Sequence, residues 1–522
     1  MSQSLIQALQ NPALYDHPIN TFQVIETHIS WIVLTGPYAY KIKKPVDFGF
    51  LDFSTLEKRR HFCQQELALN RRLAPELYLD VIAITGARES PELNGAGDVI
   101  EYAVKMIQFP QEAQLDRLLI RHGLQTGHID ELAAIIAEFH THARCADTDT
   151  AFGDPSTVWH FVEENFDQIQ PLLTQPDDLA QLQQLRTWSE TQFERLTALI
   201  AQRKRDGFVR ECHGDMHLAN MALVKNNVVI FDCIEFNDSL RWIDTVSELA
   251  FAVMDLDDRQ RPDLAARLLN GYLQYNGDYS GLALLRFYQV YRAMVRAKVA
   301  CLRLHQTGLS DSEQQAVTSR YRSYATLAQR YTRDQKPVMY LTHGVSGSGK
   351  TSLTQPALEH FGMIRIRSDV ERKRLFGLQA KEKSASATGE GIYTADASRA
   401  TYDRLRSMAR TIIEAGFSVI VDATFLKHAQ RRPFRTLSQT LGVRLVLLDF
   451  QVDEALAQRW IMERDDAGED ASEATIEVLK HQLEHREPLD DDEYDCVIHV
   501  DSGRDNAADV LFEALNRQLN PL

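Results

Sequence analysis

One short stretch constrains the fold of this chain more than any other. Residues 344–352 have the sequence GVSGSGKTS and match the pattern G-x-x-x-x-G-K-[ST] at every fixed position. An apolar run at 338–341 predicts a buried strand before it, and residues 353–361 predict a helix after it. Glycines allow successive backbone N–H groups to face phosphate oxygens, and the start of the following helix adds positive charge. The stretch therefore predicts a phosphate-binding loop.

Two residues of this loop have predicted chemical roles. Lys350 is expected to reach the outer phosphates of ATP, and the Thr351 hydroxyl is expected to bind Mg²⁺. A chance turn rich in glycine and serine is the alternative, and the flanking strand and helix count against it. The residues expected to contact the nucleotide here are Gly344, Ser346, Gly347, Ser348, Gly349, Lys350, Thr351 and Ser352.

The length of the chain requires more than one domain. A chain of 522 residues exceeds what one ordinary core can organise, and the loop lies about two-thirds of the way along it. A polar segment ends near Tyr331, and Pro337 opens the strand before the loop. We therefore predict a first domain over residues 1–330, a linker over 331–336 and a P-loop domain over 337–522.

Composition limits the partners and location of the protein. The net charge of −16 argues against a general binder of nucleic acid or of membrane surfaces. It does not exclude binding of a short nucleic-acid end. Six scattered cysteines form no C-x-x-C pair, which is typical of the reducing cytosol. The start of the chain lacks a signal-peptide pattern, and no run of about 18 apolar residues predicts a membrane span. A cytoplasmic protein that does not bind membranes is expected.

A second polar motif lies in the first domain. Residues 213–220 have the sequence HGDMHLAN, with the H-x-D-x-x-x-x-N spacing of a kinase catalytic loop, and the apolar run 228–231 ends in Asp232. In such a site one Asp accepts the proton of the acceptor hydroxyl, while an Asn and a second Asp hold metal. The alternative is that Asp215 and Asn220 cap a turn and Asp232 ends a strand.

Two charged residues upstream fit the same site. Residues 38–43 alternate like a hairpin strand that contains Lys41, and residues 54–73 predict a helix that contains Glu66. Each is an ordinary surface residue when taken alone. Their order before the second motif favours a kinase-type nucleotide site.

The first roughly 330 residues resemble the aminoglycoside phosphotransferase family, a branch of the protein-kinase-like fold. The sequence HGDMHLAN with the following Phe231 and Asp232 carries the likeness. The resemblance implies a bilobed α+β domain, with a small β lobe over about 1–108 and a helical lobe over about 109–330. The roles that it implies are Asp215 as catalytic base, Asn220 and Asp232 as Mg²⁺ ligands, and Lys41 with Glu66 as the pair that positions the α- and β-phosphates, with Lys43 and Lys44 as rivals for the place of Lys41.

The first domain departs from protein kinases in three ways. It has no G-x-G-x-x-G loop near its start, Cys-Ile-Glu follows Asp232 in place of Phe-Gly, and no A-P-E segment follows. These departures favour a small-molecule kinase. Arg241, Asp244 and Glu248, which lie just past the metal-binding segment, predict a salt-bridge network that supports it.

The last third contains candidates for an acceptor site. Residues 363–367 predict a strand, and Asp369 follows it at the edge where parallel α/β sheets carry functional groups. Asp369 is expected to orient or deprotonate the acceptor hydroxyl, and Arg372, one helical turn later, to hold the acceptor or its phosphate. An N-cap Asp with a surface Arg is the alternative. Asp422 ends another apolar strand and is expected to bind in the Mg²⁺ shell or to orient the acceptor.

Two further segments border this predicted site. The helix predicted over 453–464 carries Arg459 and Arg464, which are candidates for a lid over the transferred phosphate. Ordinary pairing on the helix surface is the alternative. Residues 376–398 indicate a mobile loop over the acceptor site or a surface insertion.

Residues 337–501 resemble the P-loop kinases that include polynucleotide kinase, zeta toxins and gluconate kinase. The likeness rests on GVSGSGKT, on the D-x-x-R of Asp369 and Arg372, on the strand ending at Asp422, and on the two lid arginines. The whole chain resembles bacterial bifunctional aminoglycoside phosphotransferase/ATP-binding proteins. This implies a two-domain α+β and α/β protein, in which a protein-kinase-like bilobed domain is followed by a P-loop parallel-sheet α/β domain.

The function implied is phosphotransfer from two Mg-ATP sites to hydroxyl acceptors, which are small metabolites or nucleotides. One alternative is a 5′-hydroxyl polynucleotide kinase in the P-loop domain, with the first domain as its substrate-binding module. Another is a non-catalytic ATP-sensing scaffold, which would bind ATP without turnover.

Overall fold

The computed structural model describes residues 3–49, 51–303, 310–384, 390–467 and 470–519. The loop predicted over 376–398 falls partly in one of the gaps between these ranges. None of the helices within the described ranges is long and apolar enough to cross a membrane.

The chain forms two compact units, and neither is an uninterrupted block of sequence. The first unit contains Met1–Asp255 and Tyr291–Tyr321, and the second contains Leu256–Val290 and Arg322–Leu522. This division reflects which residues pack together. The linker predicted at 331–336 separates two domains that are continuous in sequence, and it stays a prediction.

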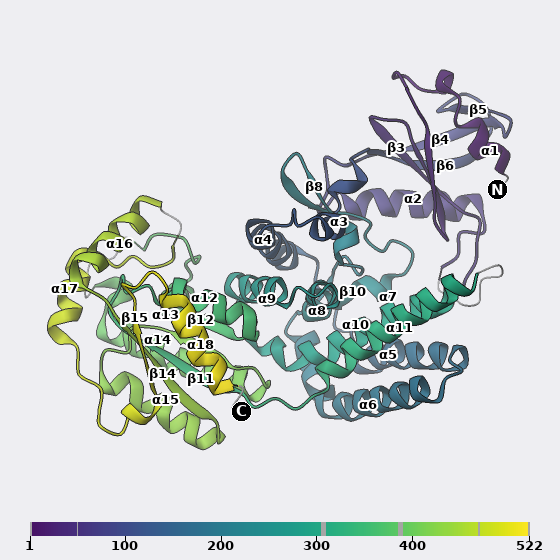
Figure 1. Ribbon diagram of the computed structural model, residues 1–522. Helices are drawn as coiled ribbons and strands as arrows, with labels where there is room; N and C mark the ends of the chain where they lie inside the picture. Colours follow the sequence, from purple (N-terminus) through teal and green to yellow (C-terminus); the bar gives the residue numbers. More distant parts are fainter. Residues whose placement is uncertain (1–2, 50, 304–309, 385–389, 468–469, 520–522) are drawn as a thin grey trace. The chain divides into compact units, whose positions relative to one another are not determined.

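The first unit begins with a six-stranded antiparallel sheet (Figure 1) of spatial order β1-β2-β3-β6-β4-β5. Helix α1 (Gln3–Ala8) packs on one face and α2 (Leu56–Asn70) on the other. The strands are β1 (Gln23–Glu26), β2 (Ser30–Leu34), β3 (Tyr38–Lys43), β4 (Tyr78–Ala87), β5 (Ser90–Leu93) and β6 (Val99–Ile107).

Alternation along β3 decides which side chains reach the face covered by α2. Tyr40 and Ile42 join the apolar core on the α1 face. Lys41 and Lys43 project to the opposite face, because successive side chains of a strand alternate. Both lysines therefore meet Glu66 of α2.

The rest of the first unit is mainly helical. Two short antiparallel pairs, β7 with β10 and β8 with β9, flank residues 213–220. The helices of this region are α3 (Leu115–Ile120), α4 (Thr126–His142), α5 (Pro155–Ile169), α6 (Pro176–Arg205), α7 (Asp238–Arg241), α8 (Thr245–Asp258), α10 (Leu282–Leu302) and α11 (Asp311–Tyr331). The strands are β7 (Val209–Glu211), β8 (Met221–Val224), β9 (Asn227–Ile230) and β10 (Trp242–Asp244). Helices α8, α10 and α11 contribute residues to both units.

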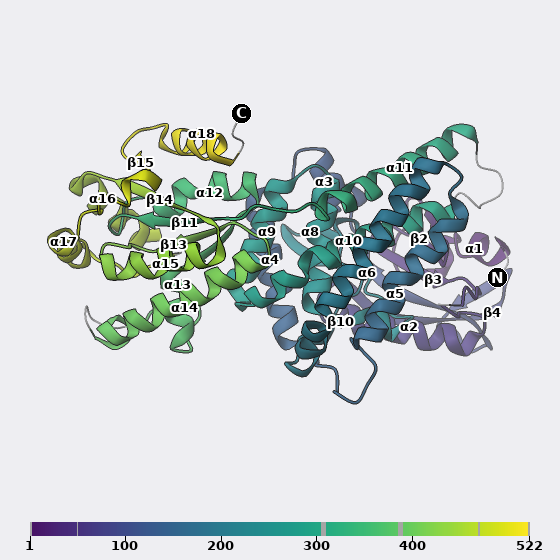
Figure 2. The same ribbon diagram turned by 90° about the horizontal axis from the view of Figure 1, so that it is seen from below.

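The second unit contains a five-stranded parallel sheet of order β12-β13-β11-β14-β15. Figure 2 shows α12 and α18 on one side of these strands, and α14 and α15 on the other. The strands are β11 (Val338–His343), β12 (Ile364–Arg367), β13 (Val419–Asp422), β14 (Arg444–Gln451) and β15 (Val497–Asp501). The helices are α9 (Pro262–Asn276), α12 (Lys350–Phe361), α13 (Ser368–Leu375), α14 (Ala395–Glu414), α15 (His428–Leu441), α16 (Glu454–Ala467), α17 (Ile476–His485) and α18 (Ala507–Leu519).

Helix α9 belongs to the second unit and covers the edge of its sheet. The Nδ2 of Asn270 donates to the backbone oxygen of Met363 at 2.9 Å, and the N–H of Arg365 donates to the Asn270 Oδ1 at 2.8 Å. One amide side chain thus takes the place of a neighbouring strand on β12, which is an edge strand. This contact fixes the strand that leads into α13.

Candidate active sites

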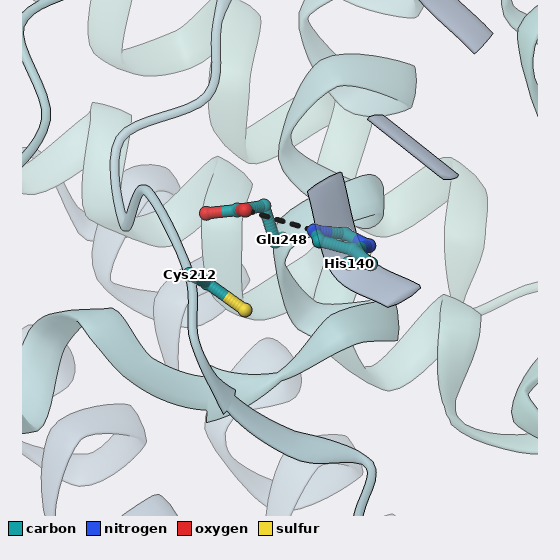
Figure 3. A group of neighbouring side chains, drawn as sticks. All are labelled: His140, Cys212 and Glu248. Atoms are coloured by element: carbon teal, nitrogen blue, oxygen red, sulfur yellow. Dashed lines mark hydrogen bonds and ion pairs between the residues drawn. The ribbon is translucent and has the colours of Figure 1, made fainter. Parts of the chain in front are cut away.

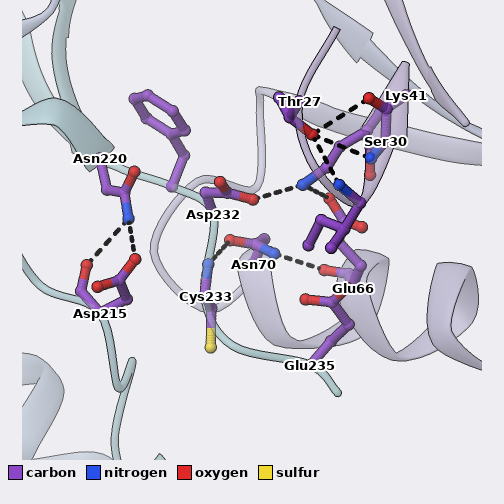
Figure 4. Close-up of polar contacts among 12 residues, drawn as sticks. Thr27, Ser30, Lys41, Glu66, Asn70, Asp215, Asn220, Asp232, Cys233 and Glu235 are labelled. Carbon is purple, nitrogen blue, oxygen red and sulfur yellow. Dashed lines mark hydrogen bonds and ion pairs between the residues drawn. The ribbon is translucent and has the colours of Figure 1, made fainter. Parts of the chain in front are cut away.

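The predicted catalytic loop lies between β7 and β8 in the first unit (Figure 4). The Nδ2 of Asn220 donates to both the backbone oxygen and the Oδ2 of Asp215, each at 3.0 Å. Because the nitrogen is used in this way, the amide oxygen is the atom through which Asn220 is predicted to bind metal. The structure therefore brings Asp215 and Asn220 together.

Two basic side chains keep Asp215 ionised. The Nε2 of His217 lies 3.4 Å from the Oδ2 of Asp215, and the Nη1 of Arg296 lies 3.3 Å from the same His217 nitrogen. Burial alone would raise the pKa of Asp215, but His217 and Arg296 lower it well below its usual range. Asp215 is therefore a carboxylate that can only accept hydrogen bonds, as the orientation of a hydroxyl requires.

Glu248 of α8 supports the catalytic loop through its backbone. Its Oε1 accepts the N–H of His213 at 2.8 Å and that of Gly214 at 2.6 Å, and its Oε2 lies 2.9 Å from the Nε2 of His140. Figure 3 shows this buried pair with Cys212 beside it. Burial alone would raise the pKa of Glu248, but the hydrogen bond from His140 lowers it to about 2. Because the Glu248 oxygens already accept three donors, this cluster is a scaffold for the loop.

The structure gives separate partners to Arg241, Asp244 and Glu248, the residues from which a supporting salt-bridge network is predicted. Asp244 pairs with Arg203 of α6 at 2.7 Å, and the Nε of Arg241 lies 3.3 Å from Glu211. Glu248 supports the loop by hydrogen bonds to its backbone. Local sequence does not indicate a partner as distant as Arg203.

Three neighbouring lysines have different partners. The Nζ of Lys41 lies 2.5 Å from the Oδ1 of Asp232 and 2.8 Å from the Oε1 of Glu66. The Nζ of Lys43 lies 2.6 Å from the Oε2 of Glu66. Lys44 pairs at 2.6 Å with Glu26, which is exposed. Among the three, Lys41 is the one that contacts both Glu66 and the predicted metal ligand Asp232 (Figure 4).

A left-handed backbone turn presents Asp232. Its φ is +64°, a conformation that costs a non-glycine residue about 1–3 kcal/mol and is typical of functional sites. The N–H of Asp232 donates to the Tyr78 hydroxyl at 3.1 Å, and the N–H of Cys233 donates to the Asn70 Oδ1 at 2.8 Å. Asn70 also donates to the backbone oxygen of Glu66. Side chains from β4 and α2 thus hold the turn that carries Asp232.

The phosphate-binding loop of the second unit joins β11 to α12. Gly347 has a φ of +77°, and a Cβ there would lie 2.7 Å from the backbone oxygen of Ala457, so the loop requires glycine at this position. The Nζ of Lys350 donates to the backbone oxygens of Gly344 at 3.0 Å and Val345 at 2.6 Å. Burial lowers the pKa of Lys350 to about 8.

The two predicted Mg²⁺ residues of the second unit touch each other. The Oγ1 of Thr351 donates to the Oδ2 of Asp422 at 2.7 Å. Thr351 is in the first turn of α12, and Asp422 ends β13, which pairs with β11. Both oxygen groups lie at the carboxyl edge of the sheet, where parallel α/β sheets bind ligands.

A cavity of about 1460 Å³ opens beside the phosphate-binding loop. Its lining includes residues 346–352 together with Asp369, Arg372 and Asp422. Single-ligand pockets have roughly 300–1,000 Å³, so this cavity has room for a nucleotide and an acceptor. The structure therefore brings the predicted acceptor residues to the same space as the loop.

Arg372 is a buried guanidinium on the acceptor side of this cavity. It is 8% exposed, and its Nη1 donates to the Ile392 oxygen at 3.0 Å and to the Ser398 Oγ at 3.2 Å. Its Nε is buried and has no hydrogen-bond partner among the described residues. Asp369 lies in the first turn of α13, and the N-cap of that helix is Arg367. The free Nε gives Arg372 a donor for a bound group.

The two candidate lid arginines differ in their surroundings. Arg459 is exposed and lies 3.8 Å from Glu463 on the same helix, which is the surface pairing expected under the alternative. Arg464 is mostly buried, and its Nη2 donates to the Ala474 oxygen at 2.5 Å. Both line the cavity.

Sequence reasoning missed three features of the sites. Lys43 shares Glu66 with Lys41 and also contacts Glu235. The spacing of two residues between the lysines was the available signal, because it puts both on one strand face. In the second unit, Gln482 of α17 accepts from the Ser346 N–H at 2.7 Å and donates to the Ser346 Oγ at 3.0 Å. No local pattern indicates that contact.

Two family models match the chain in succession. One, the phosphotransferase enzyme family, matches residues 50–288, and another, described as an AAA domain, matches residues 339–489. Three mycobacterial proteins are 30% identical over 428 residues, which covers 81% of this chain and 82% of each of them. They are described as the uncharacterized proteins Mb2027c of Mycobacterium bovis, and MT2060 and Rv2004c of Mycobacterium tuberculosis. The matches confirm the predicted fold class, a kinase-like domain followed by a P-loop domain.

Solved structures resemble each part separately. An amicoumacin kinase is 12% identical and covers 62% of this chain and 92% of its own, with a TM-score of 0.39. A gluconokinase from Sinorhizobium meliloti is 19% identical and covers 36% of this chain and 99% of its own, with a TM-score of 0.25.

Proposed function

Because the chain belongs to a family that joins a phosphotransferase enzyme domain to a P-loop kinase domain, we propose that each domain binds its own ATP and transfers the γ-phosphoryl group to a hydroxyl acceptor. One observation carries the proposal. Each unit, taken by itself, brings together a lysine, a pair of oxygen-bearing side chains and a further carboxylate. Kinase catalysis needs these three parts.

In the first site Asp215 accepts a hydrogen bond from the hydroxyl of the acceptor molecule. The acceptor oxygen forms a bond to the γ-phosphorus, the bond from that phosphorus to the bridging oxygen of ADP breaks, and the hydroxyl proton passes to Asp215. Lys41, held by Glu66 at 2.8 Å, is the cation for the α- and β-phosphates. The low pKa of Asp215 suits a group that orients the hydroxyl and takes its proton late.

In the second site Asp369 and Arg372 face the acceptor. Asp369 orients the hydroxyl and takes its proton, as Asp215 does in the first site. Arg372 offers its free Nε to the acceptor or to the phosphate that it receives. Lys350 would exchange the carbonyl oxygens of Gly344 and Val345 for the outer phosphate oxygens.

The residues at both sites fit Mg²⁺. Asn220 and Asp232 in the first site, and Thr351 and Asp422 in the second, offer only oxygen atoms, which Mg²⁺ prefers. When bound there, the ion would shield the phosphate charge. Asp232 is held for this role by its left-handed turn, and its side chain is 44% exposed.

Turnover by separate site variants tests the proposal. ATP consumption is measured against a panel of hydroxyl metabolites and of oligonucleotides with free 5′-hydroxyl ends, using the parent chain, Asp215→Asn, Asp369→Asn and the double variant. Each single change is expected to remove phosphorylation of one set of acceptors and to spare the other.

The outcomes separate the alternatives. Equal turnover by the parent and the double variant would contradict both site assignments. ATP binding without turnover on any acceptor would favour the sensing scaffold. Phosphorylation confined to 5′-hydroxyl ends, and lost only in Asp369→Asn, would favour the polynucleotide kinase.

A further inference from the structure

The proposed nucleotide lysine of the first site belongs to a group of five charged residues, of which all but Asp232 are buried. Lys41 contacts Asp232 and Glu66, and Lys43 contacts Glu66 and Glu235. A kinase site needs one lysine and one glutamate at this place, so Lys43 and Glu235 are additional. Figure 4 shows the side chain of Lys41 joined to both Asp232 and Glu66.

Lys43 is enclosed on every side that the structure describes. Its residue is 0% exposed, its Nζ lies 4.8 Å from the centre of the Phe53 ring, and two carboxylates contact it. Lys41 differs, because its partner Asp232 is 44% exposed at the side chain. Lys43 is therefore not placed to meet a phosphate from solvent.

The buried carboxylate of Glu235 requires a positive charge beside it, and Lys43 supplies that charge. Glu235 lies three residues after Asp232 and is buried, so its charge would face Glu66 without a counter-ion if Lys43 were absent. An unpaired buried carboxylate is strongly unfavourable. Lys41 is the next cation in reach, and Glu235 already acts on it electrostatically.

We propose that Lys43 is a positioning residue, which neutralises Glu235 and one oxygen of Glu66 so that Lys41 remains available to the nucleotide phosphates. This rests on the proposed role of Lys41 in the first site. Glu66 then serves both lysines, with Oε1 toward Lys41 and Oε2 toward Lys43. The segment from Asp232 to Glu235 is tied to β3 at both ends by the same two lysines.

Charge-balanced variants test the proposal. Binding of Mg-AMP-PNP is measured by titration calorimetry in the full chain carrying Lys350→Met, so that the second site contributes little. Lys43→Met is expected to weaken binding about ten-fold, or about 1.4 kcal/mol, because Lys41 is drawn toward Glu235, which has lost its cation, and away from the phosphates. Lys43→Met/Glu235→Met removes both charges and is expected to return the affinity to within about three-fold of the parent.

The opposite result has a definite meaning. If Lys43 touched the nucleotide itself, the double variant would bind as weakly as Lys43→Met, and the proposal would be overturned. The double variant decides the matter even if Lys43→Met fails to fold, because it leaves no buried charge unpaired. A melting temperature that stays lowered while the affinity recovers would separate positioning from a merely structural role.

Two further variants serve as controls. Lys44→Met removes a lysine that pairs with exposed Glu26, and it is expected to leave the affinity unchanged. Lys41→Met is expected to abolish binding, and Glu235→Met is not expected to rescue it. If Lys41→Met binds like the parent, the proposed function of the first site fails. If Lys41→Met loses binding and Lys43→Met does not, only the present proposal fails.

Discussion

The two sites hold their proposed phosphate-binding lysines in opposite ways. Lys41 lies against two carboxylates, and although burial alone would lower its pKa, Asp232 and Glu66 raise it well above its usual range. Lys350 lies against backbone oxygens, no carboxylate within the described ranges pairs with it, and burial lowers its pKa to about 8. Under the proposed roles, the first site exchanges one anion for another when ATP binds, while the second gains a new ion pair. Carboxylates thus hold the lysine side chain in the first site, and backbone oxygens of the loop hold it in the second.

The largest expected effect is loss of the proton acceptor in either site. Asp215→Asn and Asp369→Asn should each lower turnover of the matching acceptor by about 10²–10⁴-fold, the usual contribution of a positioned acid or base. Nucleotide affinity should change little, because neither residue is proposed to bind ATP. Single-turnover rates and binding isotherms, measured together, check this.

A loss of affinity equal to the loss of rate would contradict the assignment. In that case the residue would act on nucleotide binding and not on the acceptor. Asp244→Asn is unsuitable as a control in the first site, since it would break the buried pair with Arg203. In the second unit, Asp396→Asn in α14 is a suitable control for Asp369→Asn, because this residue is 91% exposed at its side chain.

Removal of the lysine charge should have different effects on protein stability at the two sites. Lys350→Met should weaken nucleotide binding at the second site by about 10²-fold or more, since a desolvated phosphate contact is lost. Lys41→Met should abolish binding at the first site and, in addition, should lower the stability of the first unit. The reason is that Glu66 and Asp232 lose a buried cation, whereas Lys350 leaves behind uncharged carbonyl and hydroxyl oxygens. Calorimetry and thermal melting of both variants measure the two effects.

The sequence predicted the fold well where a motif sets the local geometry. The stretch 344–352 follows β11 and runs into the first turn of α12, as the strand and helix predicted around it require. Its backbone approaches other segments closely, since a Cβ at Gly347 would lie 2.7 Å from the backbone oxygen of Ala457. The assignment of α9 to the second unit was not predictable. Its contact through Asn270 joins residues 93 and 95 positions apart, and no local pattern encodes it.

The candidate residues were predictable by type and less so by partner. The order of Lys41, Glu66 and Asp232 along the chain and the family resemblance predicted that they share one site, and the structure brings them together. The sequence did not indicate that Lys43 shares Glu66, since a second lysine on a strand is commonly a surface residue. Nor did it predict that Glu248 holds the catalytic loop by its backbone N–H groups. Such contacts depend on tertiary packing and not on periodicity.

A pH titration should sharpen the comparison of the two lysines. Lys350, with a pKa near 8, loses its charge as the pH rises above 8, so ATP affinity at the second site should fall by up to about ten-fold between pH 7 and pH 9. Lys41 stays charged over this range, because its pKa is raised, and the first site should not respond. Lys350→Arg should remove the pH dependence, because arginine stays protonated. Equal profiles at both sites would contradict the difference in lysine environment.

The smallest expected effect concerns the arginines of α16. The first site has its charges paired before ATP binds, whereas the second keeps Arg464 beside the cavity with its Nε unpartnered within the described part of the chain. Arg464→Ala should therefore lower kcat of the second site by about ten-fold, as loss of one charged contact to the transferred phosphate would.

Arg459→Ala is the matched control on the same helix. Because Arg459 is exposed and has Glu463 as its one ion-pair partner among the described residues, its loss should change kcat by less than about two-fold. The reverse order of effects would assign the lid role to Arg459 and leave Arg464 as a support for residue 474.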